Sequence, residues 1–149
     1  MITTNSIPTQ NELKQILTPE QYRITQEHGT EAPFSGIYAE TKKPGMYRCI
    51  VCNSILFSST QKYDSGCGWP SFWDSAVLEN IETSVDNSHF TTRTEVHCKV
   101  CQAHLGHIFD DGPAPTGKRF CINSASLNLD TTANPEVGHN INFKVKSKE

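Results

Sequence analysis

Four of the six cysteines form two C-x-x-C pairs, Cys49 with Cys52 and Cys98 with Cys101, and this spacing constrains the fold more than any other feature. A C-x-x-C turn directs two thiolates to one point. Two such turns complete a tetrahedral shell of four sulfurs suited to Zn²⁺. Because the pairs are far apart in the chain, a shared metal would tie two distant hairpin turns together. We therefore predict one structural zinc ion bound by these four cysteines.

Other uses of the four cysteines are two local disulfides, a thioredoxin-like redox pair, four buried free thiols, or iron in place of zinc. A redox C-x-x-C normally opens a helix in a βαβ unit, and the surrounding residues here are of strand type. His97 beside Cys98 could in principle replace a cysteine ligand. The preferred interpretation is a closed zinc site that supplies folding energy and rigidity, because no coordination position is left for a substrate.

The 149 residues correspond to one domain, with 36% hydrophobic residues. The mean hydropathy of −0.48 indicates a thin core that a bound metal would support. No run approaches the roughly 20 apolar residues of a membrane-spanning helix, and no export signal is evident, which predicts a soluble, cytoplasmic chain. A net charge of −3 argues against nucleic-acid binding. We expect a monomer without nucleic-acid or membrane partners.

Two helix start signals fall within residues 1–30. Thr9 with Glu12 fits a capping box, and Thr18 begins a second signal with proline at the first helical position. Gly29 is placed to end the second helix in a left-handed cap. This segment is therefore expected to form a helical cover over the rest of the domain.

Beyond the helical segment, short runs of β-branched and aromatic residues are separated by Gly, Pro, Asn, Asp and Ser, which predicts a β core over residues 34–145. Strands are expected within Met46–Phe57, around a tight knuckle, and within Phe90–His97 and Arg119–Leu127. Polar connections are expected at Asp110–Gly117 and Asn128–Gly138.

Cys121 belongs to neither C-x-x-C pair and lies in the third predicted strand. The two-residue period of a strand places Arg119, Cys121 and Asn123 on one face. A nearby cation lowers the pKa of a thiol and raises its thiolate fraction, as a nucleophilic cysteine requires. The alternative is a small buried side chain on a half-polar strand.

Cys67 is flanked by glycines and followed by an aromatic cluster that includes Trp69 and Trp73. A cysteine on such a hinge could reach another thiol after a reaction. The alternatives are an incidental loop cysteine and tryptophans that only pack.

His104 and His107 lie in a His-Leu-Gly-His segment. Imidazoles donate and accept protons near neutral pH, so this pair near a thiol suggests acid catalysis. The alternative for each is a structural histidine.

Together these segments resemble the methionine sulfoxide reductase B family, whose members reduce the R epimer of methionine sulfoxide. The resemblance rests on three segments that occur in family order beside both C-x-x-C pairs. They are Gly66-Cys67-Gly68-Trp69-Pro70-Ser71-Phe72, His104-Leu105-Gly106-His107 and Arg119-Phe120-Cys121-Ile122-Asn123-Ser124. The resemblance implies a mainly β fold of two antiparallel β-sheets, with short N-terminal helices and a structural four-cysteine zinc site away from the chemistry.

The resemblance also implies roles for the remaining candidate residues. These are Cys121 as nucleophile, Cys67 as resolving cysteine, His107 as principal acid with His104 nearby, Trp69 as contact for the sulfoxide methyl group, and Asn123, beside Arg119, as organiser of the site. The implied reaction forms a sulfenic acid on Cys121 and then a Cys67–Cys121 disulfide. Thioredoxin would reduce that disulfide, and no organic cofactor is implied. The substrate would be methionine-R-sulfoxide, free or in proteins.

Three alternatives carry different expectations. A zinc-ribbon binding module would use the four sulfurs, and Cys67, Cys121 and both histidines would then have no functional role. A non-catalytic relative with the same β fold, such as a guanine-nucleotide-release accessory protein, would not need a cysteine at position 121. A general peroxidase would reduce peroxides with the same two thiols.

Overall fold

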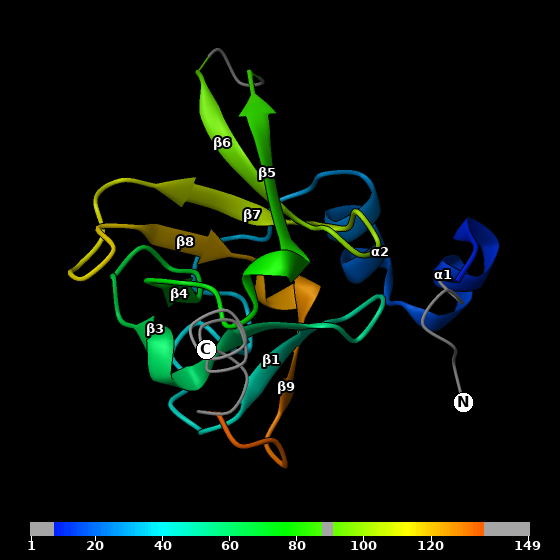
Figure 1. Cartoon of the computed structure of the whole chain (residues 1–149). Coiled ribbons are helices and arrows are strands. Elements are labelled where there is room, and N and C mark those ends of the chain that lie inside the picture. The colour runs from blue at the N-terminus through cyan, green and yellow to red at the C-terminus, as the bar shows by residue number, and fades with distance from the viewer. Residues whose placement is uncertain (1–7, 88–90, 136–149) are drawn as a thin grey trace.

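Two antiparallel sheets and two short N-terminal helices make up residues 8–87 and 91–135, the part of the chain that the computed structural model describes (Figure 1). The helices are α1 (Gln10–Ile16) and α2 (Pro19–Gln26). The strands are β1 (Met46–Cys49), β2 (Ile55–Ser58), β3 (Lys62–Tyr63), β4 (Ser71–Phe72), β5 (Ile81–Asp86), β6 (Arg93–Cys98), β7 (His104–Phe109), β8 (Arg119–Ile122) and β9 (Leu127–Asp130).

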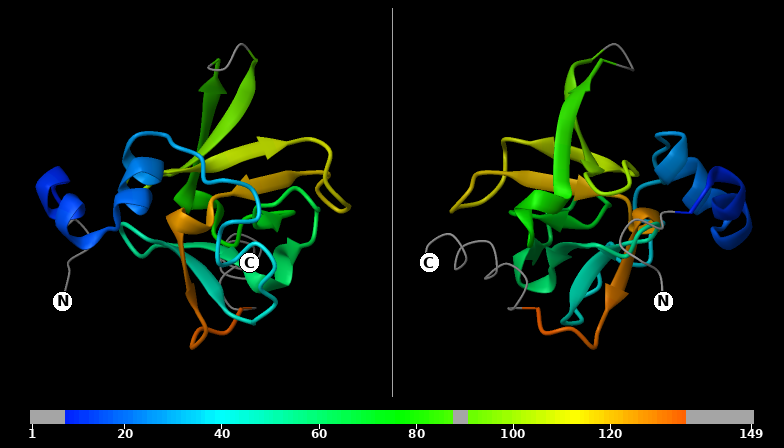
Figure 2. Two further views of the ribbon diagram at one scale, coloured as in Figure 1. Left: turned by 180° about the vertical axis from the view of Figure 1, so that it is seen from behind. Right: turned by 45° about the vertical axis from the view of Figure 1, so that its right-hand side comes forward.

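The smaller sheet has the order β2-β1-β9 and the larger one the order β3-β4-β8-β7-β6-β5. Every strand pair is antiparallel. The chain runs from the larger sheet to the smaller one where β8 leads into β9. The β5–β6 hairpin projects away from the rest of the domain (Figure 2). This architecture confirms the predicted mainly β fold with short N-terminal helices. None of the helices in the described ranges has the length and apolar character to cross a membrane.

Both predicted helix starts are confirmed. The Thr9 hydroxyl accepts a hydrogen bond from the Glu12 N–H at 3.2 Å, and the Glu12 carboxylate accepts one from the Thr9 N–H at 2.8 Å. Thr18 forms the same reciprocal pair with Gln21 at the start of α2. These contacts satisfy backbone donors that a helix start leaves unpaired.

The predicted left-handed cap at Gly29 is wrong by one residue. His28 adopts the left-handed conformation, with φ 57°, and Gly29 donates to the Arg23 carbonyl at 3.2 Å. A Cβ on Gly29 would lie 2.7 Å from the Arg23 guanidinium and 3.1 Å from its carbonyl oxygen. Glycine at position 29 thus allows a close approach to Arg23, and the unusual backbone angle falls on a histidine.

The single strand predicted over Arg119–Leu127 is wrong, because the structure has two strands there with a turn between them. β8 ends at Ile122, a 3-10 turn over Ser124–Ser126 follows, and β9 then joins the other sheet. The polar connection predicted from Asn128 is consequently wrong for its first three residues, which belong to β9, and residues 136–138 lie outside the described ranges. The break occurs because the turn's backbone donors are satisfied by a distant side chain instead of a strand partner.

Other boundaries agree more closely. The strand, knuckle and strand within Met46–Phe57 and the connection Asp110–Gly117 are confirmed. The strand predicted from Phe90 begins at Arg93 in the structure, and Phe90 itself lies outside the described residues. No strand occurs in residues 34–45, so the β core begins at Met46, and its predicted end at residue 145 lies outside the described ranges.

The hydrophobic core is centred on three phenylalanines. The rings of Phe57 and Phe72 stack with centroids 4.4 Å apart, and Phe120 meets Phe57 at 5.5 Å. Phe120 and Ile122 of β8 point into this core. Because strand side chains alternate, Arg119 and Cys121 face the opposite side. Packing on one face of β8 therefore fixes where the Cys121 thiol lies.

Candidate active site and metal centre

The four paired cysteines converge on one point. Sγ of Cys49 lies 3.6 Å from Sγ of Cys101, Sγ of Cys52 lies 3.6 Å from Sγ of Cys98, and all four sulfurs lie within 4.8 Å of one another. A tetrahedral site with Zn–S bonds of roughly 2.3 Å places its sulfurs roughly 3.8 Å apart, whereas a disulfide needs roughly 2.0 Å. The donor set therefore fits a tetrahedral thiolate-binding metal ion and excludes disulfides among these four residues in this structure.

Two backbone turns of the same geometry direct the cysteine sulfurs toward a common centre. Asn53 and Gln102, each the residue after a C-x-x-C pair, adopt left-handed conformations with φ 67° and 69°. Each donates its N–H to the carbonyl of the first cysteine of its pair, at 2.8 and 2.7 Å. His97 is turned to Glu82, with Nε2 2.8 Å from the carboxylate, and takes no part in the cluster. Within residues 8–87 and 91–135, the four sulfurs are thus the donors of this cluster.

Cys121 occupies the centre of a row of side chains across the larger sheet. It pairs with Ser71 of β4 on one side and with His107 of β7 on the other. Directly opposed side chains in antiparallel strands lie on the same face, with Cβ atoms roughly 5 Å apart. Strand register therefore brings a thiol and an imidazole together, as the sequence analysis anticipated. β7 can approach β8 this closely because Gly106 has no side chain: a Cβ there would lie 2.1 Å from the Cys121 carbonyl oxygen.

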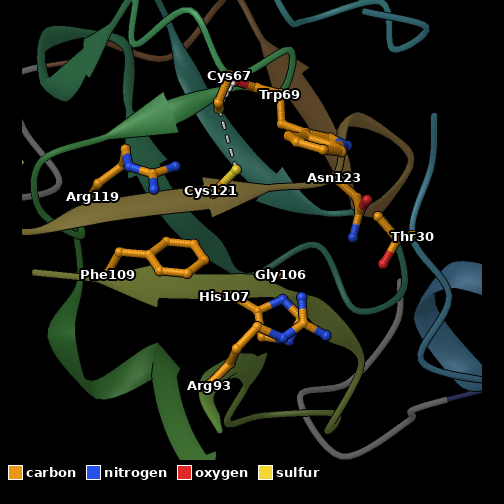
Figure 3. Close-up of a pocket in the computed structure, with 10 residues that line it drawn as sticks. All are labelled: Thr30, Cys67, Trp69, Arg93, Gly106, His107, Phe109, Arg119, Cys121 and Asn123. Atoms are coloured by element: carbon orange, nitrogen blue, oxygen red, sulfur yellow. Dashed lines mark hydrogen bonds between the residues drawn. The ribbon is translucent and has the colours of Figure 1, made fainter. Parts of the chain in front are cut away.

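The Cys67 side chain approaches Cys121 from the loop between β3 and β4. Its Sγ lies 3.4 Å from Sγ of Cys121, and neither cysteine is in a disulfide (Figure 3). The flanking glycines both adopt positive φ, 78° at Gly66 and 98° at Gly68, which other residues rarely do. The glycines thus allow the tight turn that directs Cys67 toward β8.

The two thiols differ in acidity. Burial opposes ionisation of Cys67, but hydrogen bonds from Ser65 at 3.0 Å and with Ser71 at 3.4 Å outweigh it and lower its pKa to about 7. Burial raises the pKa of Cys121 well above its usual range, and a charge on Cys67 raises it further. Arg119 lowers the pKa of Cys121, as expected from the sequence, but this effect is the smaller one. The cation that the sequence predicts beside Cys121 is therefore present, but burial and the neighbouring thiol outweigh its effect on the Cys121 pKa.

Arg119 is fixed in position by two contacts besides its interaction with Cys121. Its guanidinium bonds the Asp111 carboxylate at 2.8 and 3.3 Å and lies over the Phe109 ring, 4.4 Å from the centroid. These contacts place a fixed positive charge beside Cys121, two residues along the same face of β8.

The two histidines of β7 lie on the same side of the sheet because of a β-bulge. Val96 pairs with Gly106 and His97 with His104, so Leu105 is an extra residue on β7. The rings of His104 and His107 consequently lie with centroids 5.5 Å apart.

Each of these imidazoles contacts a carboxylate that the sequence analysis did not single out. Nε2 of His107 lies 2.8 Å from Asp86, which also pairs with Arg93 at 3.3 Å. Nδ1 of His104 lies 2.7 Å from Glu95. Both carboxylates come from the β5–β6 hairpin, and a strand pairing of this kind cannot be read from spacing along the chain.

A cavity of about 280 Å³ opens over this row (Figure 3). Six of the predicted residues line it: Cys67, Trp69, His107, Arg119, Cys121 and Asn123. His104 does not line it, and none of the four metal-cluster cysteines does. Thr30, Arg93, Gly106 and Phe109 complete the lining and were not predicted. One apolar-walled cavity thus joins the two cysteines, an imidazole and an indole.

The SelR domain matches residues 17–131, which is most of the chain and includes the whole cavity. The chain belongs to the methionine sulfoxide reductase B family. It is 58% identical to a peptide methionine sulfoxide reductase MsrB of Hahella chejuensis over 116 residues, covering 78% of this chain and 84% of the relative. A Synechococcus MsrB is 54% identical over 81% of this chain and 89% of its own length. A mouse mitochondrial methionine-R-sulfoxide reductase B3 is 56% identical, but this chain covers only 48% of it.

In this member of the methionine sulfoxide reductase B family, Glu31 connects two walls of the cavity. Its N–H donates to Asn123 Oδ1 and its carbonyl accepts from the Trp69 indole N–H, both at 3.0 Å. Its carboxylate accepts from the N–H groups of Ser124 at 2.8 Å and Ala125 at 3.0 Å. The sequence analysis missed this residue, because its contacts join segments about 90 positions apart.

Replacing Glu31 with glutamine should lower the free energy of unfolding by about 1–3 kcal/mol, because one buried N–H would then face an amide NH₂ instead of an acceptor. Urea unfolding at pH 7 measures this change. Glu20→Gln is the matched control, since its exposed pair with Arg23 should contribute under about 1 kcal/mol. Equal effects of the two substitutions would show that the Glu31 contacts do not hold the cavity walls.

Proposed function

We propose that the chain reduces methionine-R-sulfoxide to methionine, with Cys121 as the nucleophile. The observation that supports this most directly is the row in which Cys121 lies between Cys67 and His107 at the floor of the cavity. The names of the relatives give the same reaction class. The indole of Trp69 would receive the sulfoxide methyl group, and Asn123 would hold the cavity wall.

In the first step Cys121 attacks the sulfoxide sulfur, and the sulfoxide oxygen must gain a proton, because hydroxide leaves sulfur poorly. We assign this proton to His107, whose ring Asp86 orients from 2.8 Å. The Cys67 thiolate, 3.4 Å away, accepts the proton that Cys121 loses. The protonated oxygen then moves to the Cys121 sulfur as the bond between the two sulfurs breaks. The products are methionine, a Cys121 sulfenic acid, a Cys67 thiol and neutral His107, so atoms and charge balance.

In the second step Cys67 attacks the sulfenic acid sulfur, water leaves, and a Cys67–Cys121 disulfide forms. An external dithiol then reduces this disulfide, and we propose thioredoxin for that task. The turn between Gly66 and Gly68 has to close the 3.4 Å separation to a bonded distance of roughly 2 Å. In this scheme His104 lies next to His107, outside the cavity, and supports it. Arg119 supplies a fixed positive charge.

The four-cysteine centre would hold zinc in this scheme. When bound, the ion supplies folding energy and fixes the two turns, and it takes no part in the reaction. The chain is proposed to act as a monomer on free or protein-bound substrate.

The decisive experiment uses purified protein, dithiothreitol, and the separated R and S epimers of a methionyl sulfoxide. Methionine should form from the R epimer only, and hydrogen peroxide should be consumed far more slowly. Equal turnover of both epimers would contradict the assignment of the cavity, while faster reduction of peroxide would favour a peroxidase.

Cys67→Ser should leave a single turnover and abolish thioredoxin-driven recycling, because the sulfenic acid then has no resolving thiol. The first turnover should also be slower than in the parent at pH 8 and nearly equal at pH 6. A thiolate with a pKa of about 7 is about 90% formed at the higher pH and about 10% at the lower one. Rapid-quench measurement of methionine per enzyme checks both parts. Unchanged multiple turnover with thioredoxin would remove Cys67 from the scheme.

A further inference from the structure

A second group of metal-ligating side chains lies outside the four-cysteine centre and outside the cavity. It consists of His28 at the end of α2, Glu95 on β6 and His104 on β7, whose ligand atoms all lie within 4.8 Å of one another. α2 packs against β7, so the fold itself brings these three elements together (Figure 1). We propose that His28, Glu95 and His104 form a binding site for a divalent transition-metal ion.

The donor geometry supports this site. Nδ1 of His28 lies 2.8 Å and Nδ1 of His104 2.7 Å from the same oxygen, Oε2 of Glu95. Ligand atoms about 2.1 Å from a metal and at right angles to each other are roughly 3 Å apart. Both nitrogen–oxygen separations are therefore close to those of neighbouring ligands on one metal ion, and the two nitrogens lie within 4.8 Å of each other. Two imidazoles and one carboxylate in that arrangement suit a divalent transition metal and leave other positions open.

In this structure Nδ1 of His104 donates to the Glu95 carboxylate at 2.7 Å, because an ionised carboxylate can only accept. Its other nitrogen, Nε2, is buried and has no hydrogen-bond partner within the described ranges. A bound metal ion would replace the proton at Nδ1, and Nε2 could carry the proton in the metal-bound form. Glu95 is buried with its oxygen between the rings, which gives the site its negative charge.

His28 provides access from solvent. Its side chain is 64% exposed, whereas those of Glu95 and His104 are 10% and 2% exposed. The residue is held at φ 57°, a conformation that a histidine rarely adopts, and this backbone angle turns the ring over Glu95. An ion could thus enter from the His28 side and complete its shell with water.

The two metal centres differ in chemistry, so they can be distinguished in one protein. Thiolates favour zinc or iron in the four-cysteine centre, while the nitrogen and oxygen donors of the second site suit Co²⁺ or Ni²⁺. Cobalt bound to thiolates gives intense sulfur-to-metal charge-transfer bands, and cobalt bound by imidazole and carboxylate does not.

The test uses the full chain without a histidine tag, loaded with one equivalent of zinc and dialysed against Co²⁺. The parent should bind one further equivalent of cobalt, retain its zinc and show no thiolate charge-transfer band. His28→Asn should weaken this binding by more than about tenfold, the smallest loss typical of removing even an outer partner of a metal site. Asparagine tolerates the left-handed conformation at this exposed position, so the variant should fold.

Glu82→Gln is the matched control. It breaks an imidazole–carboxylate pair of the same 2.8 Å length, with His97, that has no second imidazole. Cobalt binding should be unchanged in this variant and lost in Glu95→Gln. No cobalt uptake by the parent, or equal uptake by the parent and His28→Asn, would overturn the proposal.

Discussion

Cys121→Ser should reduce turnover of methionine-R-sulfoxide by at least about 10³-fold, with no burst of methionine in the first turnover. A serine hydroxyl is a far weaker nucleophile than a thiol and cannot carry the oxygen as a sulfenic acid. The substitution should disturb the fold little, because position 121 faces the cavity and not the phenylalanine core. Rapid-quench measurement of methionine per enzyme gives the result directly.

The matched control is Cys67→Ser, the same atomic change at the sulfur 3.4 Å away. If Cys121 is the nucleophile, the control variant releases one methionine per chain and Cys121→Ser releases none. If the roles were reversed, the two outcomes would exchange. The comparison is needed because hydrogen bonds lower the pKa of Cys67 to about 7, whereas burial raises that of Cys121, so acidity alone does not identify the nucleophile.

The sequence predicts the parts of this site that depend on local spacing. The C-x-x-C turns, the capping boxes at Thr9 and Thr18, and the shared face of Arg119 and Cys121 all follow from residues close together in the chain. Each was confirmed because hydrogen-bond geometry over three or four residues fixes the local structure. The resemblance to the family supplied the convergence of Cys67 on Cys121, which spacing alone does not imply.

The sequence does not predict contacts that arise from strand register or burial. The pairing of His107 with Asp86 and of His104 with Glu95 depends on the β5–β6 hairpin lying beside β7 in the sheet, and the extra residue in β7 is visible only in the register. The raised pKa of the Cys121 thiol also comes from burial. A cation beside Cys121 is evident from the sequence, but the burial that outweighs it is not.

Cys49→Ser should abolish binding of one equivalent of metal and lower the melting temperature by about 10 °C or more. Structural zinc in small domains contributes roughly 10–16 kcal/mol of binding free energy, of the same order as the whole stability of a domain. For about 150 residues, each kcal/mol corresponds to roughly 2–4 °C. Metal analysis and thermal unfolding are the measurements, with Cys67→Ser as a control that keeps both values.

The position of the cluster explains why the effect should be global. Cys49 ends β1 in the smaller sheet, and Cys98 ends β6 in the larger one, so a bound ion ties the two sheets together. Cys49 is also part of the buried core, and its replacement alone could act through packing. Cys101→Ser removes a ligand at a half-buried turn, where little packing is lost. Both variants and the chelated parent should therefore melt at nearly the same temperature, whereas a loss confined to Cys49→Ser, with metal retained, would assign the effect to packing.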